Sequence, residues 1–231
     1  PDHEDLVAKG STLISGENLY YHNHGTAVLG EVTAVDNTIG CIGITPNLAS
    51  VRVVSEWRDE STYDTADAIL SALDVLNFGD VLLLEAQTNY GSYSKVPVEV
   101  YAATFDVIRL GSALGVIIVE AAGNGANDLD TLSFGGYGQM LNRSSDDFRD
   151  SGAIMVGAAT SAAPHSRMSF SNYGSRIDCY AWGENVNTLT GSPGVTNDYT
   201  ATFSGTSSAS PIVSGAAQAV QGKLHAGPGY R

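Results

Sequence analysis

The chain of 231 residues is long enough for one α/β domain that forms its core without help from a disulfide or a metal. Its formal net charge of −14, from 11 basic and 25 acidic residues, argues against binding to nucleic acids or anionic membranes, which needs a basic surface. No apolar stretch approaches the length of about 18 residues that suggests a membrane-spanning helix. No repeat or linker divides the chain, so we expect a single domain over residues 1–231.

Two hydrophobic patterns alternate along the chain. Short apolar runs predict buried strands, and apolar residues spaced by about 3.6 positions predict helices between them. The predicted strands are Val51–Val54, Val81–Leu84, Val116–Val119, Ala153–Gly157 and Ile177–Ala181. The predicted helices open at His24, at Thr62–Thr65, at Pro97 and at Ser207, with Gly79 stopping the second and Gly111 ending the third. This alternation predicts an α/β fold with a mostly parallel central sheet and helices on both faces.

Two of the predicted helix starts carry a nucleophile and a base. His24-Gly25-Thr26 opens the first helix, and Gly205-Thr206-Ser207 opens the last one. A serine at a helix N-terminus lies among unpaired backbone N–H groups, which favour developing negative charge. A serine hydroxyl is a poor nucleophile until a base within hydrogen-bond reach takes its proton. The pattern therefore predicts Ser207 as the nucleophile and His24 as its base.

A third element lies between them in the sequence. The buried run that ends in Ala121-Ala122 leads directly into Gly123-Asn124-Gly125. An Asn amide on a glycine-flanked turn at the carboxyl end of a strand is well placed to donate to an oxyanion. Because ligands of parallel sheets bind at this edge, we expect Asn124 to be part of the site.

Taken in this order, the motifs His-Gly-Thr, Ala-Ala-Gly-Asn and Ser-Gly-Thr-Ser-x-Ala-Ser-Pro resemble the subtilisin-like serine peptidases, or subtilases. The resemblance covers nearly the whole chain, because Asn37–Pro46, Ser151–Ala159 and Ser169–Gly174 also fall where that family has counterparts. It implies a secreted serine endopeptidase that cleaves proteins or peptides. It also implies an oxyanion hole formed by Asn124 and the backbone N–H of Ser207.

Further roles follow only from this resemblance. Thr206 is expected to support the oxyanion hole. The candidate substrate-binding residues are Glu85, Ala86, Gln87, Ala121 and Gly123. Glu85 departs from the small Ser-x-Gly wall of the family, and we expect it to line the pocket edge and favour a basic or polar residue before the scissile bond. The alternative is a buried, hydrogen-bonded Glu that fixes a loop, since a desolvated and unpaired carboxylate is costly.

The resemblance also implies a structural Ca²⁺ site. The segment 35–41 matches in length the family loop that wraps this ion. The implied ligands are the carbonyl groups of Val35, Ile39 and Cys41 and the side chains of Asn37 and Asp5. They fall just short of the roughly six to eight oxygen ligands that Ca²⁺ takes. The alternative is a plain turn with Asn and Gly at left-handed positions.

The acidic member of the expected triad is missing from its family position. The family has an Asp before the His, on the first core strand, and His3–Leu6 resembles the segment that follows this strand. Asp2 stands too close to that segment, and Asp150-Ser151-Gly152 comes after His24 and is interpreted as a turn. We therefore expect a domain that is incomplete at its N- and C-terminal ends. Its catalytic Asp is expected upstream of Pro1, in the parent protein or in a separate N-terminal segment.

Other classes of protein compete with this interpretation. A catalytically inactive binding or scaffold domain on the same fold would explain the missing Asp, and it remains the alternative. An α/β-hydrolase esterase places its nucleophile in Gly-x-Ser-x-Gly and orders its triad Ser, acid, His. Here Ser207 is followed two residues later by Ala209, and His24 comes first. The same histidine motif argues against a peptidase class that uses a Glu base with Gly-Thr-Ser.

Overall fold

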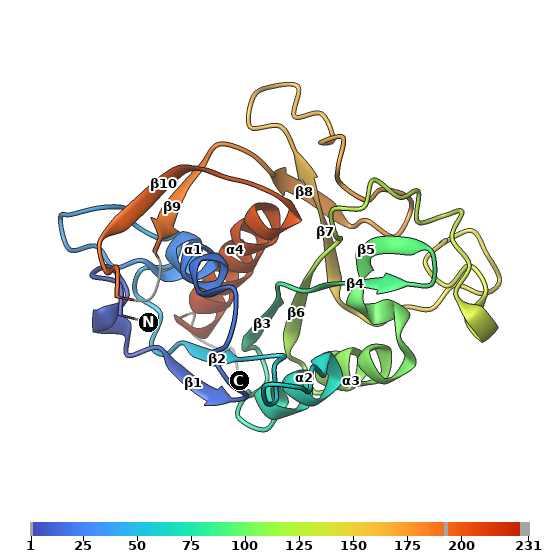
Figure 1. Ribbon diagram of the computed structural model, residues 1–231, viewed down its shortest axis with the longest axis horizontal. Helices are drawn as coiled ribbons and strands as arrows, with labels where there is room; N and C mark the ends of the chain where they lie inside the picture. The colour runs from blue at the N-terminus through green and yellow to red at the C-terminus, as the bar shows by residue number, and fades with distance from the viewer. Residues whose placement is uncertain (1, 192–193, 227–231) are drawn as a thin grey trace.

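The protein is an α/β structure, described by a computed structural model for residues 2–191 and 194–226. Within these residues, four strands form one parallel sheet in the order β3-β6-β7-β8 (Figure 1). Their bounds are Val81–Leu84, Ile117–Ala121, Ile154–Ala159 and Cys179–Trp182. The predicted strands at these places are confirmed, with ends shifted by up to two residues.

Helices cover both faces of this sheet, as predicted (Figure 1). The helices are α1 (His22–Thr33), α2 (Thr65–Leu73), α3 (Ala102–Ala113) and α4 (Thr206–Ala226). Successive residues of a strand point to opposite faces, so β3 contributes to two cores. Leu82 and Leu84 pack with α2 and α3, whereas Val81 and Leu83 pack with α4. Helix α1 lies against α4 on this second face.

The remaining strands of the described chain form two-stranded pairs. β1 (Thr12–Ser15) and β2 (Arg52–Val54) are parallel, whereas β4 (Gln87–Tyr90) with β5 (Tyr93–Pro97) and β9 (Val186–Thr190) with β10 (Asp198–Phe203) are antiparallel. Single 3₁₀ turns are formed by Val7–Lys9, Val98–Val100 and Gly135–Tyr137. Of all these elements, the hydrophobic pattern predicted only β2.

The four-stranded sheet and the β1–β2 pair each present an open edge. β3 pairs only with β6 and β2 pairs only with β1 among the residues that the structure describes. Val54 of β2 packs against the same core that Leu82 and Leu84 of β3 enter. The two unpaired edges therefore border one hydrophobic layer.

The prediction for the third helix is wrong at both ends. Pro97 ends β5, and α3 begins only at Ala102, after a 3₁₀ turn. Gly111 was expected to end the helix but lies inside it. A Cβ atom at this position would come within 2.9 Å of the Leu73 side chain and 2.8 Å of the Ile118 side chain. Gly111 therefore serves the close packing of α3 on α2 and β6.

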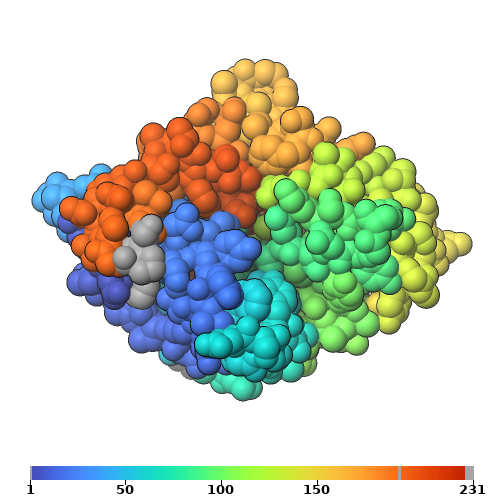
Figure 2. Space-filling model, in the orientation of Figure 1, coloured from blue at the N-terminus to red at the C-terminus, as the bar shows by residue number. Residues whose placement is uncertain are grey.

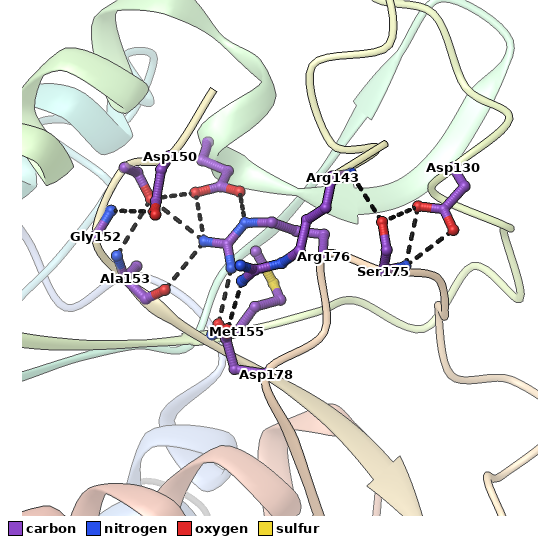
Figure 3. A network of polar contacts seen from close by, with 11 residues as sticks. Asp130, Arg143, Asp150, Gly152, Ala153, Met155, Ser175, Arg176 and Asp178 are labelled. Carbon is purple, nitrogen blue, oxygen red and sulfur yellow. Dashed lines mark hydrogen bonds and ion pairs between the residues drawn. The ribbon is translucent and has the colours of Figure 1, made fainter. Parts of the chain in front are cut away.

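A fully buried arginine connects several of these elements (Figure 3). Arg176 Nε donates to Glu99 Oε1 at 2.7 Å, and Nη1 donates to Asp178 Oδ2 at 2.8 Å. Nη2 donates to the carbonyl oxygen of Ala153 at 3.0 Å. The guanidinium therefore joins the 3₁₀ turn before α3 to the chain just before β7 and β8.

The Asp-Ser-Gly sequence lies beside this network and forms a turn, as expected (Figure 3). Asp150 Oδ1 accepts a hydrogen bond from the backbone N–H of Gly152 at 2.9 Å. The hydroxyl of Ser151 donates to Glu99. These bonds give Asp150 and Ser151 structural roles.

We predict that Arg176→Ala lowers the free energy of unfolding by about 3–5 kcal/mol, because Glu99 would stay buried without a counter-charge. Denaturation by urea measures the loss. The matched control is Arg143→Ala, which removes the partly exposed ion pair with Asp178 and should cost about 1 kcal/mol or less. Equal losses for the two variants would contradict a special role for the buried charge.

Candidate active site

The end of β6 and the start of α4 meet through a set of hydrogen bonds. The backbone N–H of Gly123 donates to Thr206 Oγ1 at 3.2 Å. The N–H and the hydroxyl of Thr206 both donate to Asn124 Oδ1, at 2.9 and 3.1 Å. Since the amide oxygen accepts both bonds, the NH₂ group of Asn124 points away from Thr206. No described residue accepts a hydrogen bond from it, so it is free to donate to an oxyanion.

Ser207 is the accessible hydroxyl at this helix start. Among residues 205–210, all of which the structure describes, Ser207 alone is not buried. Gly205 has a φ of +110°, a left-handed value that lets the chain turn sharply into α4. The neighbouring Ser208 is directed inward and donates to the carbonyl oxygen of Trp182 at 3.0 Å. In Figure 2 the N-terminal (blue), central (green) and C-terminal (red) parts of the chain meet in the middle of the face shown.

His24 lies in the first turn of α1, which begins two residues earlier than predicted. Its ring is partly exposed and contacts the edge of Phe203 in β10, with ring centroids 5.9 Å apart. Burial lowers the pKa of His24 below its usual value of 6.5. The imidazole is therefore neutral at pH 7 and able to accept a proton.

Glu85 follows β3 directly and points toward both expected catalytic residues. Its Oε2 lies 4.0 Å from His24 Nε2, and its Oε1 accepts a hydrogen bond from Ser210 in α4. Burial raises the pKa of Glu85 to about 8, and hydrogen bonds from Ser210 and Ser207 partly oppose this rise. Within the described residues, no aspartate pairs with His24, and Glu85 is the acidic group nearest to its ring.

The sequence reasoning missed a second acidic residue. Glu31 is buried in α1, and neither of its carboxyl oxygens has a hydrogen-bond partner among the described residues. Burial, together with the charge of Glu85, raises the pKa of Glu31 to about 9. Glu31 comes seven residues after His24, a spacing that places two side chains on one face of a helix. The spacing from His24 was the sequence signal that could have pointed to Glu31 as a residue of the site.

Two of the expected substrate-binding residues lie around Asn124. Gln87 Oε1 accepts a hydrogen bond from the Asn124 backbone N–H at 2.9 Å, and Gly123 bonds to Thr206. Ala86 and Ala121 are buried at the ends of β3 and β6. Beyond Gln87, a surface cavity of about 350 Å³ is lined by residues that include Tyr63, Thr88 and Tyr101.

The expected calcium ligands lie around one buried carboxylate. Asp5 is fully buried, and the backbone N–H of Val35 donates to its carbonyl oxygen at 3.0 Å. Asn37 Nδ2 donates to Asp5 Oδ1 at 2.9 Å, and the Cys41 N–H donates to Asp5 Oδ2 at 3.2 Å. Ile39 N–H donates to Asn37 Oδ1 at 3.2 Å. The loop therefore closes on Asp5.

Known proteins resemble this chain over nearly its whole length. The model of the subtilase family matches residues 11–227. Subtilisin DY from Bacillus licheniformis is 32% identical over 226 residues, which make up 96% of this chain and 72% of that protein. The chain belongs to the subtilase family of serine peptidases. A thermostable alkaline protease from Halalkalibacterium halodurans is also 32% identical, over 96% of this chain and 54% of that protein.

A solved structure shows the same fold. The crystal structure of a cold adapted subtilisin-like serine proteinase superposes with a TM-score of 0.60 at 20% identity, covering 96% of this chain and 71% of that one. The expected subtilase resemblance and the α/β fold class are therefore confirmed. None of the described helices is both long and apolar enough to cross a membrane.

Proposed function

We propose that this subtilase chain forms most of a serine endopeptidase that acts on proteins or peptides. One observation carries the proposal: two bonds from Thr206 hold Asn124 at the start of α4 with its amide group free, and the next residue, Ser207, has an accessible side chain. Family membership supports the same activity. The acidic surface and the family resemblance favour an extracellular site of action.

The reaction follows from these roles. The Ser207 oxygen forms a bond to the carbonyl carbon of the scissile peptide, while its proton moves to His24 Nε2. The carbonyl oxygen takes up the electron pair, and Asn124 and the Ser207 N–H donate to it. His24 then gives the proton to the departing amine, which breaks the C–N bond. Water hydrolyses the acyl-enzyme by the same steps and releases Ser207.

We predict that Ser207→Ala abolishes hydrolysis of peptides and esters in the full-length protein, because no other accessible hydroxyl lies at the start of α4. A serine-directed phosphonate should add its mass to the peptide that contains Ser207. Ser208→Ala is the matched control and should keep most of the activity, since its hydroxyl bonds inward to Trp182. Labelling at another serine would contradict the assignment. A folded protein that is not labelled at all would support the inactive scaffold domain.

The acid that orients His24 is, in our proposal, an Asp on a strand outside residues 1–231. Two observations support it: no described aspartate pairs with His24, and β2 and β3 expose unpaired edges to one core. A parallel strand between these edges would join the β1–β2 pair to the four-stranded sheet and end at the carboxyl edge where Asn124 lies. It would also cover two edges that otherwise invite aggregation.

The prediction is that one upstream Asp is essential. In the full-length protein, its change to Asn should lower kcat by about 10⁴-fold. This is the size of the loss in other Ser-His-Asp peptidases, including a subtilisin. The loss arises because His24 would no longer be held in one tautomer and orientation. Kinetics of single Asp→Asn variants of the upstream segment measure it. If every such variant keeps full activity, the acid comes from elsewhere.

We also propose that the segment 35–41 and Asp5 hold a structural Ca²⁺. The buried Asp5 carboxylate has no cationic partner in the described part of the chain, and this loop bonds to it through the Asn37 side-chain amide and the Cys41 backbone N–H. Burial and nearby carboxylates raise the pKa of the Cys41 thiol to about 11, so this residue would bind through its carbonyl oxygen. Carboxylate, amide and carbonyl oxygens suit Ca²⁺. The ion would fix the loop that follows α1.

We predict that a calcium chelator lowers the Tm by roughly 5–10 °C, because an ion bound only by the folded state adds to its stability. Differential scanning calorimetry of the full-length protein with calcium and with chelator measures the shift. Asn37→Ala should reduce this calcium dependence. A Tm that does not respond to the chelator would favour the plain turn, in which Thr38 and Gly40 take left-handed φ values of 71° and 58°.

A further inference from the structure

Glu85 is held where a carboxyl group can act on both halves of the catalytic pair. It follows Leu84, the last residue of β3, so the position of its backbone is fixed by a strand of the parallel sheet. One carboxyl oxygen accepts a bond from the Ser210 hydroxyl, whose oxygen also lies 2.8 Å from the Thr206 carbonyl oxygen. The other oxygen lies 4.0 Å from His24 Nε2, the nitrogen that takes the proton of the nucleophile.

These contacts leave Glu85 poorly placed for binding substrate. Its carboxyl group lies between α1 and α4, and the hydroxyls of Ser207 and Ser210 approach it from α4. The buried, hydrogen-bonded alternative of the sequence analysis therefore describes its geometry better than a place at the pocket edge. A carboxyl in contact with the nucleophile and next to the base can influence the reaction itself.

We propose that Glu85 is a positioning residue that holds the side chains of Ser207 and His24 in a fixed relative position. When ionised, it also stabilises the protonated imidazole of His24. This inference rests on the proposed peptidase function. A negative charge at 4.0 Å favours the charged form of His24, so ionised Glu85 makes the imidazole a stronger base. The pKa of about 8 places this change of charge within the pH range in which subtilase activity can be assayed.

Few other ionisable groups face this carboxyl. From α1 it meets His24 and Glu31, and the charge of Glu85 contributes to the raised pKa of Glu31. Helix α4 offers hydroxyl groups only, because its first ionisable side chain is Lys223, four turns further along. On the neighbouring strand β6, Glu120 turns to the opposite side and accepts a bond from the Glu99 N–H.

Glu31 provides a matched control. The charge of Glu85 contributes to the raised pKa of Glu31, so ionised Glu85 favours the protonated form of Glu31. A glutamine at position 31 imitates this neutral carboxyl, whereas a glutamine at position 85 removes a group that ionises. The two variants make the same chemical change at neighbouring buried sites, and only one of them should alter the chemistry of His24.

The first experiment is the pH profile of kcat and KM for a peptide ester, measured from pH 5 to 10 on the full-length protein. We expect the wild type to gain activity in two steps, one for His24 below pH 6.5 and one for Glu85 near pH 8. Glu85→Gln should lose the upper step and about tenfold in kcat at pH 9, with KM nearly unchanged. Glu31→Gln should keep both steps.

The second experiment needs neither turnover nor a folded Glu85 variant. In full-length Ser207→Ala, the ¹⁵N chemical shifts of the His24 ring should change in a second titration step at or above pH 8. The step should not lie lower, because the lost Ser207 hydroxyl no longer lowers the Glu85 pKa. Glu85→Gln in this background should remove the step, and Glu31→Gln should keep it.

The outcomes separate this inference from the proposed function. An upper step that persists in Glu85→Gln, or an NMR titration of His24 without a step, would overturn the role of Glu85. If Glu85→Gln changes only KM and the preference for substrate side chains, Glu85 is a substrate-binding residue instead. Absence of hydrolysis and of phosphonate labelling in the wild type would refute the peptidase, whereas the NMR step would still report on Glu85 and His24.

Discussion

The buried charge of Arg176 constrains the half of the molecule that carries Asn124, the proposed oxyanion donor. A guanidinium removed from water costs several kcal/mol unless its N–H groups find partners of opposite charge. Glu99 and Asp178 both supply them: Glu99 accepts from Nε, and Asp178 accepts from Nη1. Figure 3 shows Asp178 beside the guanidinium group. Burial and the neighbouring Glu99 raise the pKa of Glu120 well above its usual value. Because Glu120 lies in β6 and bonds to the Glu99 N–H, the network also fixes the strand that leads to Asn124.

The two sides of the active site are held by different means. On the side of the proposed oxyanion hole, Asn124 and Thr206 are 82 residues apart in sequence but bonded directly, so the proposed donor is oriented before any substrate arrives. On the side of the proposed base, the contacts of the His24 ring with described residues are those with Phe203 and with the distant carboxyl of Glu85. Within the described residues, the base is thus the less constrained partner. It also lies near the end of β3, whose edge away from β6 has no partner strand among the described residues.

Sequence patterns predicted the parts of this structure that depend on local chemistry. Carboxyl ends of parallel strands share an edge, so the strand pattern placed Asn124 at the ligand-binding edge of the sheet. Its pairing with Ser207 at the start of α4 was implied by the resemblance to subtilases. The same local signals failed where tertiary packing decides. Pro97 has the φ of a helix start but ends the hairpin strand β5, and Gly111 stays helical because α2 and β6 leave no room for a side chain. The sequence reasoning missed Glu31 because Glu85, whose charge acts on it, lies 54 positions away along the chain. The helical spacing from His24 does not by itself reveal this interaction.

Burying Glu31 and Glu85 together couples the chemistry of the site to the stability of the fold. Folding raises both pKa values from 4.5, to about 9 and about 8, so the folded state binds protons more tightly than the unfolded chain. The stability that this proton binding contributes is fully present below pH 4.5 and is lost as the pH rises toward 8 and 9. The ionisation of Glu85 that strengthens His24 as a base therefore occurs where this contribution is being lost. A donor placed beside the carboxyl oxygens of Glu31, which lack hydrogen-bond partners among the described residues, would relieve the conflict.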